Sequence, residues 1–172
     1  MNRADEDEYR QFVVARLEAL RRTAYLLCRD WHTADDLVSI TIGKLYRHWR
    51  RVRAADNVDA YVRGVLTNAW LDERRRPWRR EQATDEVPDQ VDLALPQTAL
   101  VDRQALLELL GELPPRRRAV IVLRFYCDLS VEETAEALGI SPGTVKSQAA
   151  RGLEMLRVLA TNASGRSVEE WA

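Results

Sequence analysis

The chain has few of the residue types that build metal centres and disulfide frameworks. Its 172 residues include two cysteines (Cys28, Cys127) and two histidines (His32, His48), and no CxxC or HExxH spacing. This composition argues against a zinc site or a disulfide scaffold, and we expect neither a metal nor another cofactor. Both cysteines stand among apolar neighbours, so we expect them to be buried and unreactive.

Long apolar runs are also missing. No window approaches the roughly 20 apolar residues of a membrane-spanning helix. The first ten residues, MNRADEDEYR, contain neither the basic nor the apolar part of a signal peptide. We therefore expect a cytoplasmic protein without membrane insertion. With 46% apolar residues the chain can bury a core, and its length suits one ordinary domain or two small ones.

Strand-like alternation is absent, and apolar residues recur instead at spacings of three and four. Such stripes predict helices over residues 9–27, 37–52 and 58–76. Thr33 followed by Asp36 has the form of a capping box, and Asn57 is a plausible N-cap for the third helix. The sequence therefore predicts an all-α fold that begins with a small helical bundle.

A helix-turn-helix is predicted in the second part of the chain, in the run LSVEETAEALGISPGTVKSQAARGLEMLR. Ser130 with Glu133 forms a capping-box pattern, and Gly139 suits a left-handed helix end. Ser141 is placed to cap a last helix, which we expect to end at about Ala160. A short helix, a tight connection and a longer helix are the layout of a helix-turn-helix.

The start of the longer helix carries residue types that read DNA bases. Its outward positions are Thr144, Lys146, Ser147, Gln148, Ala150 and Arg151. Lysine and arginine hydrogen-bond guanine edges, serine and glutamine bond bases or phosphates, and alanine leaves room for a thymine methyl group. An ordinary solvated helix carries the same residues, so composition alone leaves both readings open. The paired caps and Gly139 favour DNA binding.

Charge is sorted along the chain, although the 26 basic and 27 acidic residues almost cancel overall. Basic residues predominate over residues 44–80, which end in LDERRRPWRR, whereas residues 81–99 contain acids and no lysine or arginine. A basic cluster with an interleaved tryptophan is typical of nucleic-acid binding, through phosphate contacts and base stacking. The acidic, proline-containing stretch that follows has no helical period and predicts a linker.

These features together resemble a known family. The segments TADDLVSITIGKLYRHW, DAYVRGVLTNAWLDERRR and LPPRRRAVIVLRFYCDLSVEETAEALGISPGTVKSQAARGLEMLR resemble bacterial sigma factors of the extracytoplasmic-function (ECF) group, in particular the actinobacterial SigE-like subset. The resemblance implies sigma domain 2 over residues 8–80, a flexible acidic linker over 81–97, sigma domain 4 (a four-helix domain containing the helix-turn-helix) over 98–160 and a flexible tail over 161–172.

The resemblance also implies a function. A sigma factor binds core RNA polymerase, recognises the minus-thirty-five and minus-ten elements of a promoter and starts DNA melting, while the polymerase performs the bond chemistry. The chain would then be no enzyme and have no catalytic residue, with core RNA polymerase, promoter DNA and an anti-sigma protein as prospective partners.

The resemblance assigns roles to individual residues. The helix-turn-helix residues named above would read the minus-thirty-five element. Those facing the minus-ten element would be Asn57, Asp59, Tyr61, Asn68, Asp72, Arg75, Arg76, Trp78 and Arg79. Those contacting the clamp helices of the largest polymerase subunit would be Asp35, Asp36, Leu37, Val38, Leu45 and Trp49. Arg116, Arg117 and Arg124 would serve DNA phosphate or the flap of the second-largest subunit.

Two other functions remain open on the sequence. A conventional helix-turn-helix regulator with an N-terminal interaction domain would bind duplex DNA tightly by itself, without polymerase. An RNA-binding adaptor would use the arginine cluster of residues 74–80, and that cluster alone supports it.

Overall fold

The computed structural model describes residues 1–76 and 103–169, and regular structure in these ranges is entirely helical. The predicted all-α class is confirmed. The elements are α1 (Arg3–Cys28), α2 (Trp31–Arg47), α3 (Trp49–Arg53), α4 (Val58–Arg75), α5 (Arg103–Glu112), α6 (Pro115–Ile121), the π-helical turn η2 (Val122–Tyr126), α7 (Val131–Leu138) and α8 (Pro142–Glu169). Among the described helices, none combines the length and the apolar character needed to cross a membrane.

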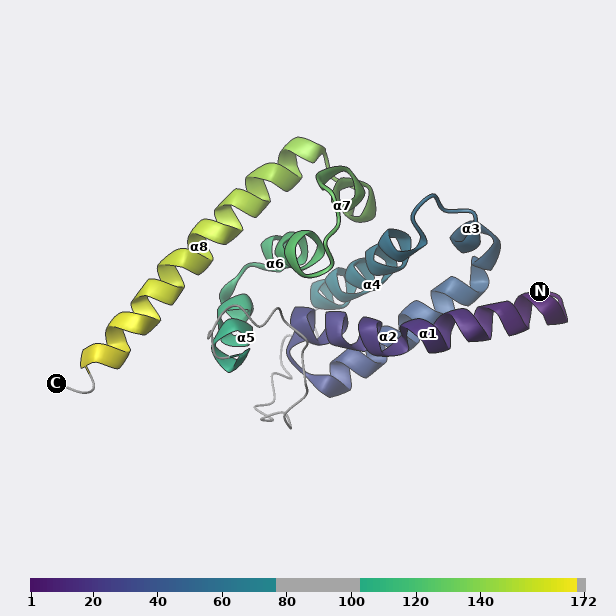
Figure 1. Ribbon diagram of the computed structural model, residues 1–172, viewed down its shortest axis with the longest axis horizontal. Coiled ribbons are helices and arrows are strands. Elements are labelled where there is room, and N and C mark those ends of the chain that lie inside the picture. Colours follow the sequence, from purple (N-terminus) through teal and green to yellow (C-terminus); the bar gives the residue numbers. More distant parts are fainter. Residues whose placement is uncertain (77–102, 170–172) are drawn as a thin grey trace.

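The first half is a bundle of α1, α2 and α4, with α3 as a short turn between the last two (Figure 1). Asn57 caps α4 as predicted, because its side chain accepts a hydrogen bond from the amide of Ala60 at 3.0 Å. The capping box predicted at Thr33 is wrong. Asp30 is the N-cap of α2, and its carboxylate accepts bonds from both the amide and the hydroxyl of Thr33, so α2 begins before the predicted cap.

An aromatic cluster holds the N-terminal part of α1 against α3. Trp49 meets Tyr9 and Phe12 edge-to-face, with ring centroids 5.4 and 5.0 Å apart. The Tyr9 hydroxyl donates to the carbonyl of Ile42 at 2.7 Å. These contacts explain why Trp49 is buried. The helix itself begins at Arg3, with the Asn2 side chain accepting from the amide of Asp5, well before the apolar stripe that predicted it.

The second half contains the predicted helix-turn-helix. Ser130 and Glu133 form the reciprocal capping box, and Gly139 ends α7 in the left-handed conformation at φ 64°. Phe125, in the π-helical turn η2, is 53% exposed. The π-helical turn η2 adds a residue to the helical repeat and so changes the direction of the side chains that follow. No proline follows Pro142 to stop α8, and the helix passes its predicted end near Ala160.

The two halves pack against each other. One hydrophobic cluster includes Leu26 and Leu27 of α1, Val62 and Leu66 of α4, Leu107 and Leu110 of α5, and Ala119 of α6. Helix α7 lies beside α4, and α6 lies between the first half and α8 (Figure 1). The sequence predicted two modules on a linker and did not predict this contact. The predicted linker and the residues from 77 to 102 as a whole lie outside the described residues.

Candidate nucleic-acid and polymerase interface

The start of α8 presents a polar face to solvent. Val145, which is completely buried, anchors the helix, and the amide of Thr144 donates to the Ser141 side chain at 3.1 Å, as the predicted cap requires. The residues that this arrangement leaves exposed are Lys146, Ser147, Ala150 and Arg151. Two donors of fixed charge, a hydroxyl and a small apolar side chain therefore share one accessible surface, as base-edge recognition in a major groove requires.

The other two predicted residues of this surface, Thr144 and Gln148, are half-buried. The Gln148 side chain is engaged by a neighbouring helix. Its side-chain oxygen accepts a hydrogen bond from Nε of Arg117 at 3.3 Å, so the two residues hold each other between α6 and α8. Gly152 is also part of this contact. A methyl group placed on it would lie 2.9 Å from Cγ1 of Ile121, which means that glycine is needed for α8 to approach α6 this closely.

The three arginines predicted to meet the polymerase flap or DNA phosphate differ in their surroundings. Arg116 is exposed, whereas Arg117 is half-buried on Gln148. Arg124 donates to the carbonyl of Leu129, at the turn before α7. The guanidinium of Arg116 is therefore the freest of the three to contact an anionic group.

The predicted minus-ten residues fall into two groups. Asp72, Arg75 and Arg76 are exposed at the C-terminal end of α4, and Tyr61 is half-buried at its start. Asp59 forms an ion pair with Arg16 of α1 at 2.8 Å. Trp78 and Arg79 lie outside the described residues.

The other group, Asn57 and Asn68, contacts the second half of the chain. The Asn57 amide donates to Oε1 of Glu133 at 2.7 Å, and the Asn68 amide donates to the carbonyl of Ala137 at 2.8 Å. Hydrogen bonds from Ser130 and then from Asn57 lower the pKa of Glu133. Two residues predicted to meet DNA are thus engaged by α7.

A cavity of about 340 Å³ lies between the two halves. Its polar lining residues are Asn68, Asp72 and Arg75 from α4, Arg116 from α6, and Thr144 and Gln148 from α8. Residues predicted for the minus-ten element and residues predicted for the minus-thirty-five element therefore line the same cavity.

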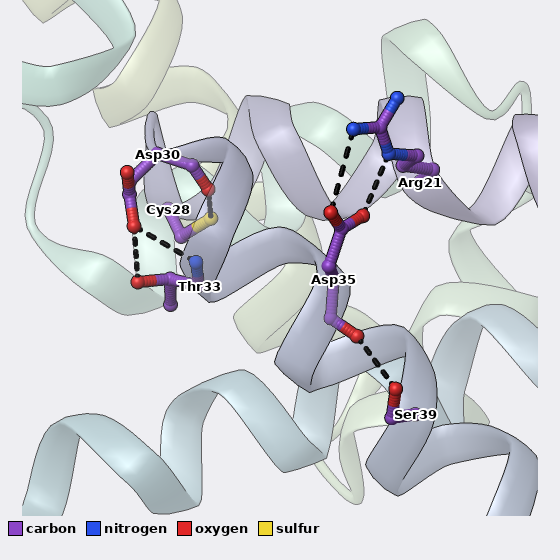
Figure 2. Close-up of polar contacts among 6 residues, drawn as sticks. All are labelled: Arg21, Cys28, Asp30, Thr33, Asp35 and Ser39. Atoms are coloured by element: carbon purple, nitrogen blue, oxygen red, sulfur yellow. Dashed lines mark hydrogen bonds and ion pairs between the residues drawn. The ribbon is translucent and has the colours of Figure 1, made fainter. Parts of the chain in front are cut away.

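The predicted polymerase-binding segment is the N-terminal part of α2. Figure 2 shows Asp35 accepting two hydrogen bonds from the Arg21 guanidinium, at 2.6 and 3.4 Å, and its backbone carbonyl accepting from the Ser39 hydroxyl. Asp36 is half-buried beside it. The apolar residues predicted for this contact, Leu37, Val38, Leu45 and Trp49, are all buried in the core. Leu37, Val38 and Leu45 form the buried face of α2, and Trp49 is the first residue of α3. The exposed side of α2 offers Asp35 and Ser39.

The end of α1 and the start of α2 are held by short-range contacts. Figure 2 shows the Cys28 thiol donating to the carbonyl of Asp30 at 3.2 Å. Burial raises the pKa of this thiol to about 12. Burial acts to raise the pKa of Asp30 too, but hydrogen bonds from Thr33 outweigh it and leave that pKa below its ordinary value.

Arg118 joins the two halves, and the sequence did not predict this role. It is 5% exposed, and its guanidinium donates to the carbonyls of Leu27 in α1, Gly111 and Leu113, at 2.7, 2.8 and 3.1 Å. It also lies over the Trp70 ring, 5.3 Å from the centroid. Burial, with Arg74 and Arg29 nearby, lowers the pKa of Arg118 to about 10. Nothing in the run Arg116 to Arg118 marks which arginine turns inward.

Comparison with known proteins places both halves in one family. Residues 12–80 match sigma-70 region 2, and residues 103–156 match sigma-70 region 4. The RNA polymerase sigma-E factor of Streptomyces coelicolor is 36% identical over 170 residues, covering 94% of this chain and 92% of the relative. The ECF RNA polymerase sigma factor SigE of Mycolicibacterium smegmatis is 33% identical over 79% of this chain and 55% of its own length.

A solved structure gives the same result for the fold. The sigma factor RpoE of Bartonella quintana, in complex with the anti-sigma factor NepR, has a TM-score of 0.71 and 26% identity, covering 90% of this chain and 97% of that one. Region 2 lies on the first half of this chain and region 4 on the second half. These are the halves that carry the two candidate DNA-binding faces. The chain therefore belongs to the sigma-70 family of RNA polymerase sigma factors, in the ECF group.

Proposed function

We propose that the chain directs RNA polymerase to promoters by reading the minus-thirty-five element with α8 and the minus-ten element with α4. The observation that carries this proposal is the exposed face of Lys146, Ser147, Ala150 and Arg151. It stands at the start of a recognition helix whose preceding turn is fixed by the caps at Ser130, Gly139 and Ser141. A rigid support is what base readout requires of such a face.

The C-terminal end of α4 supplies the minus-ten contacts. Asp72, Arg75 and Arg76 project into solvent there, and the charge of the arginines suits the phosphates of melted DNA. Asn57 and Asn68 add amide groups that can hydrogen-bond the edge of an unstacked base. Trp78 and Arg79, which follow along the chain, extend the same proposal.

The polymerase contact is proposed on the exposed side of α2. Asp36, together with Asp35 in its ion pair with Arg21, places two carboxylates on this surface, which suits basic residues of the clamp helices in the largest subunit. Arg116 on α6 is proposed for the flap of the second-largest subunit. The polymerase performs all bond chemistry in this scheme, and the chain acts where the polymerase is, in the cytoplasm. An anti-sigma protein is a further proposed partner, since the RpoE relative was solved with one.

Run-off transcription with core polymerase tests the function. Wild-type chain should give promoter-specific transcripts from a library of promoters from its own genome, and no transcript at any of them would refute the proposal. A gel shift with the isolated chain adds a second arm. Tight, sequence-specific binding to duplex DNA without polymerase would favour a conventional helix-turn-helix regulator.

Arg151→Ala tests the role of α8. If Arg151 reads a base, its loss should cost about 1 to 3 kcal/mol of discrimination between the promoter and a version mutated in the minus-thirty-five element. Arg157→Ala is the matched control, because Arg157 is exposed on the same helix and pairs with Glu154 at 2.8 Å. Equal loss on both promoters from Arg151→Ala would instead assign Arg151 to phosphate contact.

A further inference from the structure

The loop between α3 and α4, residues 54–57, contains Asn57, which is proposed for the minus-ten element. Most of this loop is exposed. The amide of Ala55 donates to the carbonyl of Val52 at 3.2 Å, and the Asn57 side chain accepts from the amide of Ala60 at 3.0 Å, where α4 begins. An exposed loop needs support at both ends if it is to hold a base-reading side chain in one position.

The N-terminal part of α1 holds the α3 end of this loop, where the two helices lie side by side (Figure 1). Nη1 of Arg53, the last residue of α3, donates to the carboxylates of Asp5 at 2.9 Å and Glu8 at 3.0 Å. Asp5 is itself fixed, because its side chain is 14% exposed and its amide donates to the Asn2 side chain. One guanidinium shared by two carboxylates forms a small network, which stabilises more than an isolated surface pair does.

A second ion pair from α1 holds the α4 end of the loop. Nε of Arg16 donates to Oδ1 of Asp59, in the first turn of α4, at 2.8 Å. The Arg16 guanidinium lies over the Phe12 ring, 4.0 Å from its centroid, and Phe12 packs edge-to-face on Trp49 at the start of α3. Arg16 therefore approaches Asp59 from a fixed position. The resemblance assigned Asp59 to DNA, whereas its carboxylate is engaged by α1.

Part of this support precedes the residues that match the sigma-70 family. Region 2 is matched over residues 12–80, and Asp5 and Glu8 come before that range, although the Arg53 that they bind lies within it. The first two turns of α1 thus add contacts to the loop that membership of the family does not by itself supply.

We propose that Asp5, Glu8 and Arg16 of α1 are positioning residues for minus-ten recognition. By fixing both ends of the loop they present the Asn57 amide to an unstacked base in one orientation. The inference rests on the proposed role of α4 at the minus-ten element. Asp59 acts in this scheme through Arg16 and not by contact with DNA. A loosened loop would distinguish bases poorly, because hydrogen-bond readout depends on distance and angle.

Run-off transcription with core polymerase and the full chain measures this selectivity. Three templates are compared: the strongest promoter found in the library from its own genome, and two versions of it mutated in the minus-ten or the minus-thirty-five element. Asp5→Asn combined with Glu8→Gln, and separately Arg16→Gln, should lower discrimination at the minus-ten element by about two- to fivefold, the range for exposed ion pairs. Discrimination at the minus-thirty-five element, which α8 is proposed to read, should stay unchanged.

Arg10→Gln is the matched control. Arg10 is exposed on α1, and its ion pair with Asp7, at 3.4 Å, stays within that helix, so both ratios should be those of wild type. Arg16→Lys keeps the charge and should restore most of the minus-ten discrimination, because the contact to Asp59 is a single hydrogen bond. Wild-type discrimination at the minus-ten element in the Arg16→Gln and the double variant, or equal losses at both elements, would overturn the inference while leaving the promoter function intact.

Asp59→Asn shows whether Asp59 acts through Arg16. If Asp59 only receives the Arg16 bond, the two changes together should lose no more minus-ten discrimination than either change alone, as coupled partners do. A further loss in the variant that combines Arg16→Gln with Asp59→Asn would mean that Asp59 contacts DNA itself, and its assignment to α1 would be wrong.

Amide hydrogen exchange on the isolated chain tests the support without transcription. Exchange over residues 54–61 should be about two- to fivefold faster in the variant with Asp5→Asn and Glu8→Gln than in wild type and Arg10→Gln. Equal rates in all three would overturn the inference whatever the transcripts show. If wild type gives no transcript at any promoter, the function proposed for α4 fails, and exchange still decides whether α1 holds the loop.

Discussion

Replacing Arg118 by methionine tests whether a buried cation holds the two halves of the molecule in place. The guanidinium donates to three backbone carbonyls, those of Leu27, Gly111 and Leu113. Arg118 is only 5% exposed, so its side chain has almost no contact with water. Methionine has a similar length and fills apolar space, but it donates no hydrogen bond, so the three carbonyls would lose their partner.

Two opposing effects set the size of the change. Each hydrogen bond to a charged group contributes about 1.5 to 3 kcal/mol, and three are lost. The pKa of Arg118, lowered to about 10 mainly by burial, shows that keeping the charge inside costs roughly 3 kcal/mol, which methionine relieves. The hydrogen bonds outweigh this cost, and we expect a net loss of about 2 to 5 kcal/mol in the free energy of unfolding.

Urea unfolding followed by circular dichroism measures this difference on the full chain. Arg116→Met is the control, since Arg116 is exposed on the same helix and its replacement should change the free energy of unfolding by no more than about 0.5 kcal/mol. If Arg118→Met unfolds with the wild-type free energy, the three hydrogen bonds do not stabilise the fold, and the magnitude worked out from them is wrong.

Two further predictions concern titratable groups. Because the pKa of Glu133 is lowered below 4.5 by bonds from Ser130 and then Asn57, its stabilising effect is present above pH 4.5 and is lost as the pH falls through the lowered pKa. NMR titration of Asn57→Ala should show a higher Glu133 pKa than wild type, and an unchanged value would mean that Asn57 and Glu133 are apart in solution. Since burial raises the pKa of Cys28 to about 12, a thiol reagent at about pH 8 should label Cys28 far more slowly in the folded chain than in urea, as followed by peptide mass spectrometry. Equal labelling rates would contradict the buried position of this thiol.

The helix ends that the sequence predicted correctly are those set by residues close together in the chain. Asn57, the Ser130–Glu133 box and Gly139 all act within one turn, so their geometry follows from spacing and side-chain chemistry. The same logic placed the start of α2 at Thr33, because Asp30 and Thr33 are both good caps. The structure selects Asp30, whose carboxylate accepts two bonds that a cap at Thr33 would not form.

The contact between the halves could not be predicted in this way. Asn57 and Glu133 are 76 residues apart, and their meeting depends on how two complete helical surfaces fit together. Arg116, Arg117 and Arg118 look alike as a basic run, yet one is exposed, one half-buried and one buried. The position of each arginine around the axis of α6, relative to α1, decides its exposure. Three identical residues in a row do not reveal that position.

The polar part of the contact between the halves uses the carbonyl ends of helices. Leu27 lies in the last turn of α1 and Ala137 in the last turn of α7, where carbonyls lack partners within their own helix. Arg118 and Asn68 supply the missing donors across the boundary between the halves. If the halves separate, water can supply them instead, so the exchange costs about 1 kcal/mol for Asn68 and about 1.5 to 3 kcal/mol for the charged Arg118.

Separation also leaves most of the Arg118 contacts in place. Its bonds to the carbonyls of Gly111 and Leu113 lie within the second half, and only the bond to Leu27 crosses to the first. Unfolding breaks all three bonds, whereas separating the halves breaks one. Arg118→Met should therefore lower the free energy of unfolding by more than it lowers the free energy of separating the two halves, and this difference separates the stability of each half from the strength of the contact between them.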